Sequence, residues 1–285
     1  MTGEGEVPVI RQESPLAKPA AARHVYEWDD PWTVRFFEAF NRRHSRYRKA
    51  NRILVKQASL EAGQAVLDFA AGTGRTADAV LPQIGPDGRV LCVEPARAMR
   101  EAGQARLADK RVGWSDELPA EGRYERVLCG AAIWTVPELA RTISLLAHYL
   151  PVGGALCFNI PGQYLGLADE PGGGDDPFLL RLPSLLSELA PAEAMDWPAP
   201  PAALSVEEIE GFLGGEGLSA RRFSFRYRLT QAEYRDWYKI PVLTNRLLPG
   251  LDAQARAARI DQVYARCDQA AWRWERWLGW TAWRP

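Results

Sequence analysis

The segment from Asp68 to Gly74 has the residue types and spacing of a nucleotide-binding turn. The apolar residues before Asp68 are typical of a buried strand, and the residues after Gly74 are spaced as in a helix. Gly72 and Gly74 allow a tight turn in which the backbone approaches a ligand closely. In open α/β sheets such a ligand lies beyond the carboxyl ends of the strands, at a helix N-terminus whose free N–H groups face it.

A second acidic residue favours the same chemistry. Glu94 ends the apolar run 89–93 and lies 20 residues after Gly74, where a carboxylate can accept hydrogen bonds from both hydroxyls of a ribose. Two alternatives stay open: an ordinary strand–helix–strand crossover without a ligand, and a dinucleotide or FAD fold. The fingerprint of the latter is G-x-G-x-x-G/A directly after the strand, whereas this chain has D-x-A-x-G-x-G.

The pattern D-x-A-x-G-x-G at 68–74 resembles motif I of the class I S-adenosylmethionine (SAM) methyltransferases, with Ala70 at the place of the family's usual first glycine. The resemblance continues from about residue 64 to 160, through five strand-turn positions. It implies SAM as the cofactor and an α/β fold: a Rossmann-like, seven-stranded, mostly parallel sheet with helices on both faces. A helical cap from the N-terminal helix and insertions is expected to close over the strand ends.

Later motifs extend the implied cofactor site. Gly113 and the pair 118–119 match a family loop that cups the adenine, but Trp114 replaces the loop's aspartate and is expected either to stack on the base or to join the core. Gly130 falls where the family's motif IV passes the methionine part of SAM, and small residues there leave room for the cofactor. The cofactor-binding residues that the resemblance implies are Asp68, Ala70, Gly72, Thr73, Gly74, Glu94, Pro95, Ser115, Asp116, Glu117, Gly130 and Ala131.

Composition and turn signals divide the chain into seven segments. These are a disordered tail (1–22), an N-terminal helical cap segment (23–62), the SAM-binding core (63–160), a cap insertion (161–204), a core helix with strand six (205–229), a helical cap insertion (230–275) and strand seven (276–285). The expected strands are 64–69, 89–93, 111–114, 124–134, 154–160, 218–229 and 278–285. The expected helices include 31–59, with a break near Asn41, and also 178–190, 205–214 and 252–275.

Charge and composition exclude several classes of protein. The net charge is −1, so no global positive field attracts nucleic acid, and the arginines and lysine of 42–52 are expected on a solvated helix face or, alternatively, in a phosphate-binding patch. Four cysteines and three histidines lack the spacing of a metal site, and no metal is expected. No signal peptide or membrane span is expected either, which favours a cytoplasmic protein with reduced thiols.

The catalytic residues are not identified by any motif. The sulfonium methyl of SAM is already electrophilic, so alignment and exclusion of water supply much of the rate enhancement. An oxygen or carbon acceptor also needs a base, for which His24, Tyr26 and Tyr164 are weak candidates, together with His44 and Asp176. Five C-terminal tryptophans are expected to pack between the last helix, the last strand and the sheet, or to line an aromatic acceptor pocket.

The leading hypothesis is a SAM-dependent methyltransferase that acts on a small, apolar or aromatic metabolite, with secondary metabolism as one setting. The alternative is a SAM-binding protein that does not methylate, such as a cyclase, a decarboxylase or a binding module, because fold does not fix chemistry. A NAD or FAD oxidoreductase is a third class. The expected partner is a small-molecule acceptor, not nucleic acid or membrane, and a homodimer is left open.

Overall fold

The computed structural model describes residues 28–174, 182, 184–185, 188, 204–245 and 248–285. Its centre is one sheet with five parallel strands. These strands are β1 (Ala65–Phe69), β2 (Arg89–Val93), β3 (Val112–Ser115), β4 (Arg126–Cys129) and β5 (Ala155–Pro161). Their spatial order β3-β2-β1-β4-β5 reverses direction between β1 and β4, which is the switch point where α/β sheets bind ligands.

Helices cover both faces of this sheet because the strands are buried on both sides. Side chains alternate along β1, so that Leu67 packs with α6 (Leu139–His148) and α8 (Val206–Gly215), and Val66 packs with α3 (Arg46–Gln57) and α4 (Arg75–Ile84). The helix α5 (Arg97–Arg106) follows β2. The expected Rossmann-like, mostly parallel sheet is therefore confirmed.

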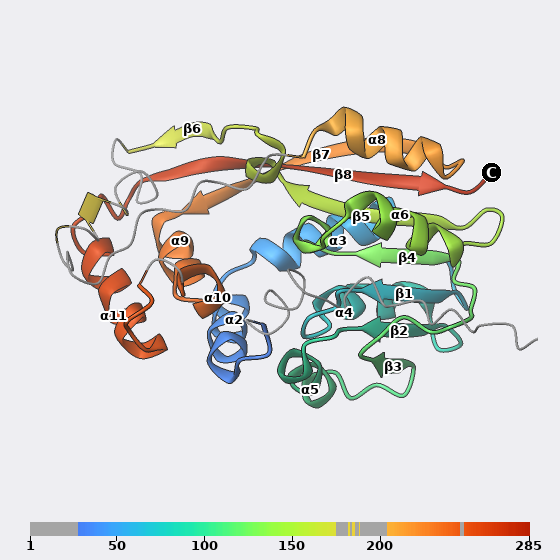
Figure 1. The fold of residues 1–285 in the computed structure, drawn as a ribbon, viewed down its shortest axis with the longest axis horizontal. Helices are drawn as coiled ribbons and strands as arrows, with labels where there is room; N and C mark the ends of the chain where they lie inside the picture. Colours follow the sequence, from blue (N-terminus) through green and yellow to red (C-terminus); the bar gives the residue numbers. More distant parts are fainter. Residues whose placement is uncertain (1–27, 175–181, 183, 186–187, 189–203, 246–247) are drawn as a thin grey trace, which may run out of the picture.

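A long antiparallel ribbon completes the sheet. The strands β7 (Ser219–Thr230) and β8 (Trp272–Trp283) pair along their whole lengths, and β8 also pairs with β5 from Ala155↔Trp283 to Pro161↔Trp277. Residues 272–276 of β8 continue beyond the end of β5, where the short strand β6 (Glu170–Gly173) pairs with them. The ribbon thus belongs to the core at one end and projects past the strand tips at the other (Figure 1).

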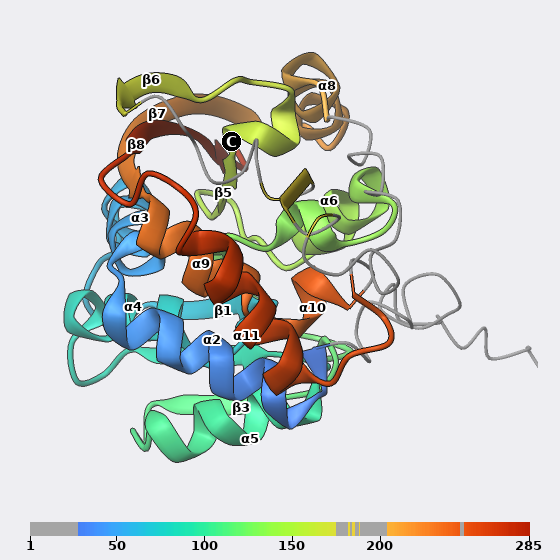
Figure 2. The same cartoon turned by 90° about the vertical axis from the view of Figure 1, so that its left-hand side faces the viewer.

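The projecting part of the ribbon carries a helical cap. Figure 1 shows the cap helices beyond the carboxyl ends of the parallel strands, and Figure 2 shows the cap from the front. Its helices are α2 (Pro31–Arg43), α9 (Gln231–Tyr238), α10 (Pro241–Thr244) and α11 (Ala253–Tyr264). Two short 3-10 helices, η1 (Ile133–Thr135) and η2 (Gly162–Leu165), follow β4 and β5 on the same side. A separate hydrophobic cluster, which includes Phe40, Trp237 and Trp277, fills the cap.

The structure corrects several expected boundaries. Among the described residues the sheet has eight strands rather than seven, because β6 lies in the expected cap insertion 161–204, where no strand was predicted. The expected helix 252–275 ends at Tyr264, and the last strand begins at Trp272 rather than at 278, since every residue from Trp272 to Trp283 pairs with a residue of β7. The expected strand 124–134 spans only Arg126–Cys129, and the long N-terminal helix breaks after Arg43 instead of near Asn41.

Two expectations lie wholly or mostly outside the described residues. The tail 1–22 precedes them, and most of the expected helix 178–190 falls between them. Within the described part of the chain, the helices are too short or too polar to cross a membrane.

Candidate functional site

The strand register brings the predicted cofactor residues to one edge of the sheet. Phe69 pairs with Val93, and Val93 pairs with Ser115, so the loops after β1, β2 and β3 begin at the same level. Asp68 pairs with Leu128 of β4, one residue before Cys129, so the segment that contains Gly130 also begins there. Residues separated by more than 60 positions in sequence therefore share one edge.

Glu94 and the glycine loop hold each other in place. The Glu94 carboxylate is buried and accepts hydrogen bonds from the backbone N–H of Gly72 at 2.8 Å and of Ala96 at 2.9 Å. Gly72 and Gly74 both have positive φ, a conformation that glycine adopts without strain. Burial raises the pKa of Glu94 to about 7, against the lowering effect of these two hydrogen bonds. Glu94 thus braces the loop, and each carboxylate oxygen keeps a second lone pair for the predicted ribose hydroxyls.

Asp68 is a buried acid with one free oxygen. Its Oδ2 accepts from the backbone N–H of Ala77 at 3.1 Å, whereas Oδ1 has no hydrogen-bond partner among the described residues. Burial raises the pKa of Asp68 to about 8. A buried unsatisfied acceptor costs free energy that a ligand donor recovers. The glycine loop, the start of α4 at Arg75 and this free oxygen therefore fit a nucleoside cofactor with hydroxyl and ammonium donors.

The cap is tied directly to the glycine loop through Glu38 of α2. Its carboxylate accepts from the Thr73 hydroxyl at 2.6 Å and forms an ion pair with Arg75. From the other side, Arg106 of α5 donates to the Thr73 carbonyl at 2.7 and 3.0 Å. Sequence reasoning missed Glu38 and Arg106, because no local pattern marks a residue whose partner belongs to another element.

The acidic loop after β3 reaches the same site. Arg100 of α5 donates to the Glu94 carbonyl at 2.7 Å and lies 3.8 Å from the exposed carboxylate of Asp116. The Ser115 hydroxyl bonds within the loop to Glu117, at 2.6 Å to its carbonyl. Trp114 packs against Gly103 and Gly74, because a side chain on either glycine would meet its ring. Of the two expected roles of Trp114, the structure shows packing between α4 and α5.

The small residues after β4, Gly130 and Ala131, allow close packing against neighbouring elements, a role that the sequence did not indicate. A Cβ on Gly130 would lie 2.3 Å from the Thr76 hydroxyl and 2.8 Å from the Asn51 amide oxygen. The space beside Gly130 is therefore occupied by α4 and α3. Ala131 has a φ of 56° and donates its N–H to Asn159 of β5 at 2.8 Å. This segment is thus fixed tightly between neighbouring elements.

The candidate bases are dispersed. His24, Tyr26 and Asp176 lie outside the described residues. His44 belongs to the cap, where its Nε2 lies 2.9 Å from the carboxylate of Asp236. Tyr164 stacks on Trp134 with ring centroids 4.8 Å apart, close to the carboxyl ends of β4 and β5.

Aromatic side chains gather at this end of β4 and β5. Trp277 pairs with Pro161 at the end of β5, and its ring lies 6.4 Å from that of Trp134 and 5.6 Å from that of Phe225. Among them lies Arg46, which is 2% exposed and pairs with the buried Glu275. Arg46 was expected on a solvated face, and this is wrong. It stands four and eight residues before the buried Ala50 and Leu54, a spacing that could have revealed it.

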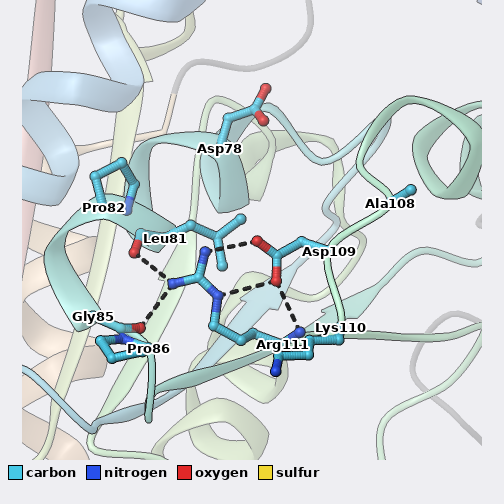
Figure 3. A pocket seen from close by; sticks show the side chains of 9 residues that line it. All are labelled: Asp78, Leu81, Pro82, Gly85, Pro86, Ala108, Asp109, Lys110 and Arg111. Atoms are coloured by element: carbon cyan, nitrogen blue, oxygen red, sulfur yellow. Dashed lines mark hydrogen bonds and ion pairs between the residues drawn. The ribbon is translucent and has the colours of Figure 1, made fainter.

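A surface hollow near Arg111 is a weaker candidate (Figure 3). It lies at the amino ends of β2 and β3, on the sheet edge opposite the glycine loop. Arg111 donates to the carbonyls of Leu81 and Gly85 at 3.1 and 2.7 Å and pairs with Asp109, so it links the end of α4 to β3. Among the described residues, no group of three or more His, Cys, Asp or Glu side chains is placed to hold a metal ion.

Part of this chain is similar in sequence to curated methyltransferases. No family model matches the chain. The demethylmenaquinone methyltransferase of Symbiobacterium thermophilum is 30% identical over 117 residues, which are 38% of this chain and 47% of that protein. The UbiE ubiquinone/menaquinone biosynthesis C-methyltransferase of Rubrivivax gelatinosus is 30% identical over 126 residues, 42% of this chain and 49% of that one. The chain thus spans about half the length of the curated relatives it matches.

Solved structures share the fold at low sequence identity. YcgJ of Bacillus subtilis has a TM-score of 0.53 at 16% identity and covers 84% of this chain and 99% of its own. A putative methyltransferase of Bacillus halodurans has a TM-score of 0.52 at 15% identity, and the match covers 83% of this chain and 99% of that one. The [4+2]-cyclase SpnF has a TM-score of 0.51 at 15% identity, and the match covers 83% of this chain and 80% of that one. In motif I, in its sheet and over the matched segments, the chain is therefore similar to class I SAM-dependent methyltransferases.

Proposed function

We propose that this protein transfers the methyl group of SAM to a small aromatic acceptor enclosed by the helical cap. The observation that carries the proposal is the position of the aromatic cluster. Trp134, Tyr164 and Trp277 lie at the carboxyl ends of β4 and β5, on the sheet edge that also carries the glycine loop and Glu94. An acceptor among these rings is next to the segment 130–131, which the motif comparison assigns to the methionine end of SAM.

The cofactor supplies a methyl group on a positively charged sulfur, which is electrophilic without activation by the protein. When bound, SAM would supply its methyl carbon to a lone pair or carbanion of the acceptor, and its sulfur would leave as a neutral thioether. The residues of this chain bind and align the two molecules. Asp68, the glycine loop and Glu94 hold the nucleoside, and the aromatic rings exclude water and orient the acceptor.

A SAM-binding protein without methyl transfer is the second candidate. The specific observation behind it is that His44 is held by Asp236 in the cap and Tyr164 is stacked on Trp134, so neither candidate base is presented freely. SpnF, a [4+2]-cyclase by name, shares the fold. Methyl transfer from labelled SAM to a small molecule of a cell extract supports the first candidate, whereas bound but unconsumed SAM supports the second.

Cofactor binding is tested separately by calorimetry with S-adenosylhomocysteine. Glu94→Ala should weaken binding by about 1–3 kcal/mol through lost hydrogen bonds to the ribose and a loosened Gly72 loop. Asp68→Asn, which removes the acid near the carboxyl end of β1, should also weaken binding. Asp109→Asn is the matched control, since this carboxylate also accepts a hydrogen bond from a backbone N–H, that of Arg111, but lies at the opposite sheet edge. Unchanged affinity in Glu94→Ala and Asp68→Asn would refute the assigned site.

The remaining properties are part of the same proposal. The acceptor is a free metabolite rather than nucleic acid, because the net charge of −1 offers no broad positive surface. The cytoplasm is the proposed compartment: all four cysteines are buried and none forms a disulfide. Secondary metabolism is a setting that suits an aromatic cap.

A further inference from the structure

Arg46 carries an unused hydrogen-bond donor inside the cap. Its Nε donates to Glu275 Oε2 at 2.9 Å and its Nη2 pairs with Oε1, which fixes the guanidinium plane. The remaining nitrogen, Nη1, is buried and has no hydrogen-bond partner among the described residues. A buried N–H without an acceptor costs free energy, and in native proteins such a group usually has a partner, a bound water or a ligand.

The surroundings of this donor are aromatic. The guanidinium carbon lies over the rings of Trp237 at 5.1 Å, Trp277 at 5.6 Å and Tyr47 at 5.7 Å. Burial would lower the pKa of Arg46, but the charge of Glu275, the Tyr47 hydroxyl and the hydrogen bonds to Glu275 together more than offset this effect and keep the pKa above its usual range. Burial raises the pKa of Tyr164, and the charge of Arg46 offsets only a small part of this effect. The donor therefore stays protonated and faces flat apolar groups.

The free donor selects one kind of oxygen. Arginine binds a carboxylate best through two parallel N–H···O bonds, and Glu275 already occupies that side of Arg46. A single nitrogen remains, which suits one acceptor oxygen carried by a flat ring. The charges of Arg46 and Glu275 cancel, so the pair favours a polar hydroxyl over a second full carboxylate.

We propose that Arg46, held by Glu275, binds the hydroxyl oxygen of a phenolic acceptor through Nη1. This inference rests on the proposed function, because it names the acceptor of the same site. Trp277 lies near both regions: its ring centroid is 5.6 Å from the guanidinium carbon of Arg46 and 6.4 Å from the ring of Trp134, next to the motif IV segment. A phenol anchored on Arg46 thus has its ring among the cap aromatics, near the methyl donor.

The test compares three flat probes in equilibrium dialysis with the full-length protein: 4-nitrophenol, nitrobenzene and 4-nitrobenzoate. The wild type should bind 4-nitrophenol at least about 10-fold more tightly than nitrobenzene, since only the phenol pairs with the buried donor. The double variant Arg46→Met/Glu275→Gln removes both charges together and should bind the two probes equally. Arg221→Met is the matched control, because Arg221 also lies over a tryptophan ring, that of Trp283, at the far end of the ribbon; it should keep the phenol preference.

Three results would overturn the proposal. They are equal binding of phenol and nitrobenzene by the wild type, a phenol preference that survives in the double variant, and tighter binding of 4-nitrobenzoate than of 4-nitrophenol. Calorimetry on the same samples measures the affinity for S-adenosylhomocysteine. It therefore tests the proposed cofactor site and shows whether each variant is folded. Loss of that binding in the wild type would count against the proposed function, while the phenol preference would still decide the role of Arg46.

Discussion

The glycine loop and the cap are built in opposite ways. At the glycine loop, the decisive contacts join a backbone N–H to a carboxylate nearby in sequence, as between Gly72 and Glu94. In the cap, the decisive contact joins two side chains 229 residues apart, Arg46 and Glu275. The first region can be identified from a short motif, whereas the second exists only when α3 meets β8.

In the function proposed above, the difference separates two tasks of one site. A backbone cradle binds a cofactor whose shape is constant, and it needs little from side chains except small size. A side-chain cluster binds the variable partner, and it can change without disturbing the cradle. Glu38 links the two regions, because it reaches from α2 to Thr73 and Arg75. The following substitutions test whether the regions are as distinct as they look.

The largest effect is expected in the cap. Arg46→Met leaves Glu275 buried and uncompensated, which should lower the free energy of unfolding by about 3–5 kcal/mol. The double variant Arg46→Met/Glu275→Gln should recover most of this loss, since no lone charge stays buried. Urea unfolding of both variants measures the difference. Equal stability of the single and double variants would show that the pair is not coupled.

A smaller effect is expected where the two regions meet. Gly130→Ala places a Cβ 2.3 Å from the Thr76 hydroxyl and should cost about 1–3 kcal/mol of stability through overpacking. Adding Thr76→Ala should restore part of it. Gly211→Ala in α8 serves as the control, because nothing lies within 4 Å of its added Cβ, and it should be neutral or stabilising. If Gly130→Ala left the free energy of unfolding unchanged, α3 and α4 would have shifted to make room for the added Cβ.

The buried acids of the glycine loop predict a pH dependence. The pKa of Asp68 is raised to about 8 and that of Glu94 to about 7, so the folded state binds more protons than the unfolded state between these values and the ordinary ones. Their effect on stability is therefore most favourable in acid and is lost as the pH rises through the raised pKa values.

Between about pH 5 and pH 8 the cofactor-free protein should lose stability through these groups, at up to about 1.4 kcal/mol per pH unit for each. Asp68→Asn removes the larger shift and should flatten the profile. Thermal unfolding across this range is the measurement. A wild-type profile as flat as that of Asp68→Asn would contradict the raised pKa.

The smallest effect concerns the one departure from motif I. Ala70 has a φ of 54°, a conformation that suits glycine better than alanine. Ala70→Gly should therefore stabilise the protein by about 1 kcal/mol. Ala96→Gly is the control, since Ala96 has a φ of −71° and should lose stability. Loss of stability in both variants would show that the loop carries no strain at Ala70.

The sequence by itself determined the nucleotide-binding half. Apolar runs, turn glycines and the position of Glu94 are local signals, so β2 was expected at 89–93 and is found there. The tertiary structure alone decided the cap. Arg46 is polar in a run of exposed cations and still lies buried, because the energy of an ion pair depends on a partner that only folding brings near. The early start of β8 has the same origin: residues 272–276 form a strand because β7 and β6 lie beside them.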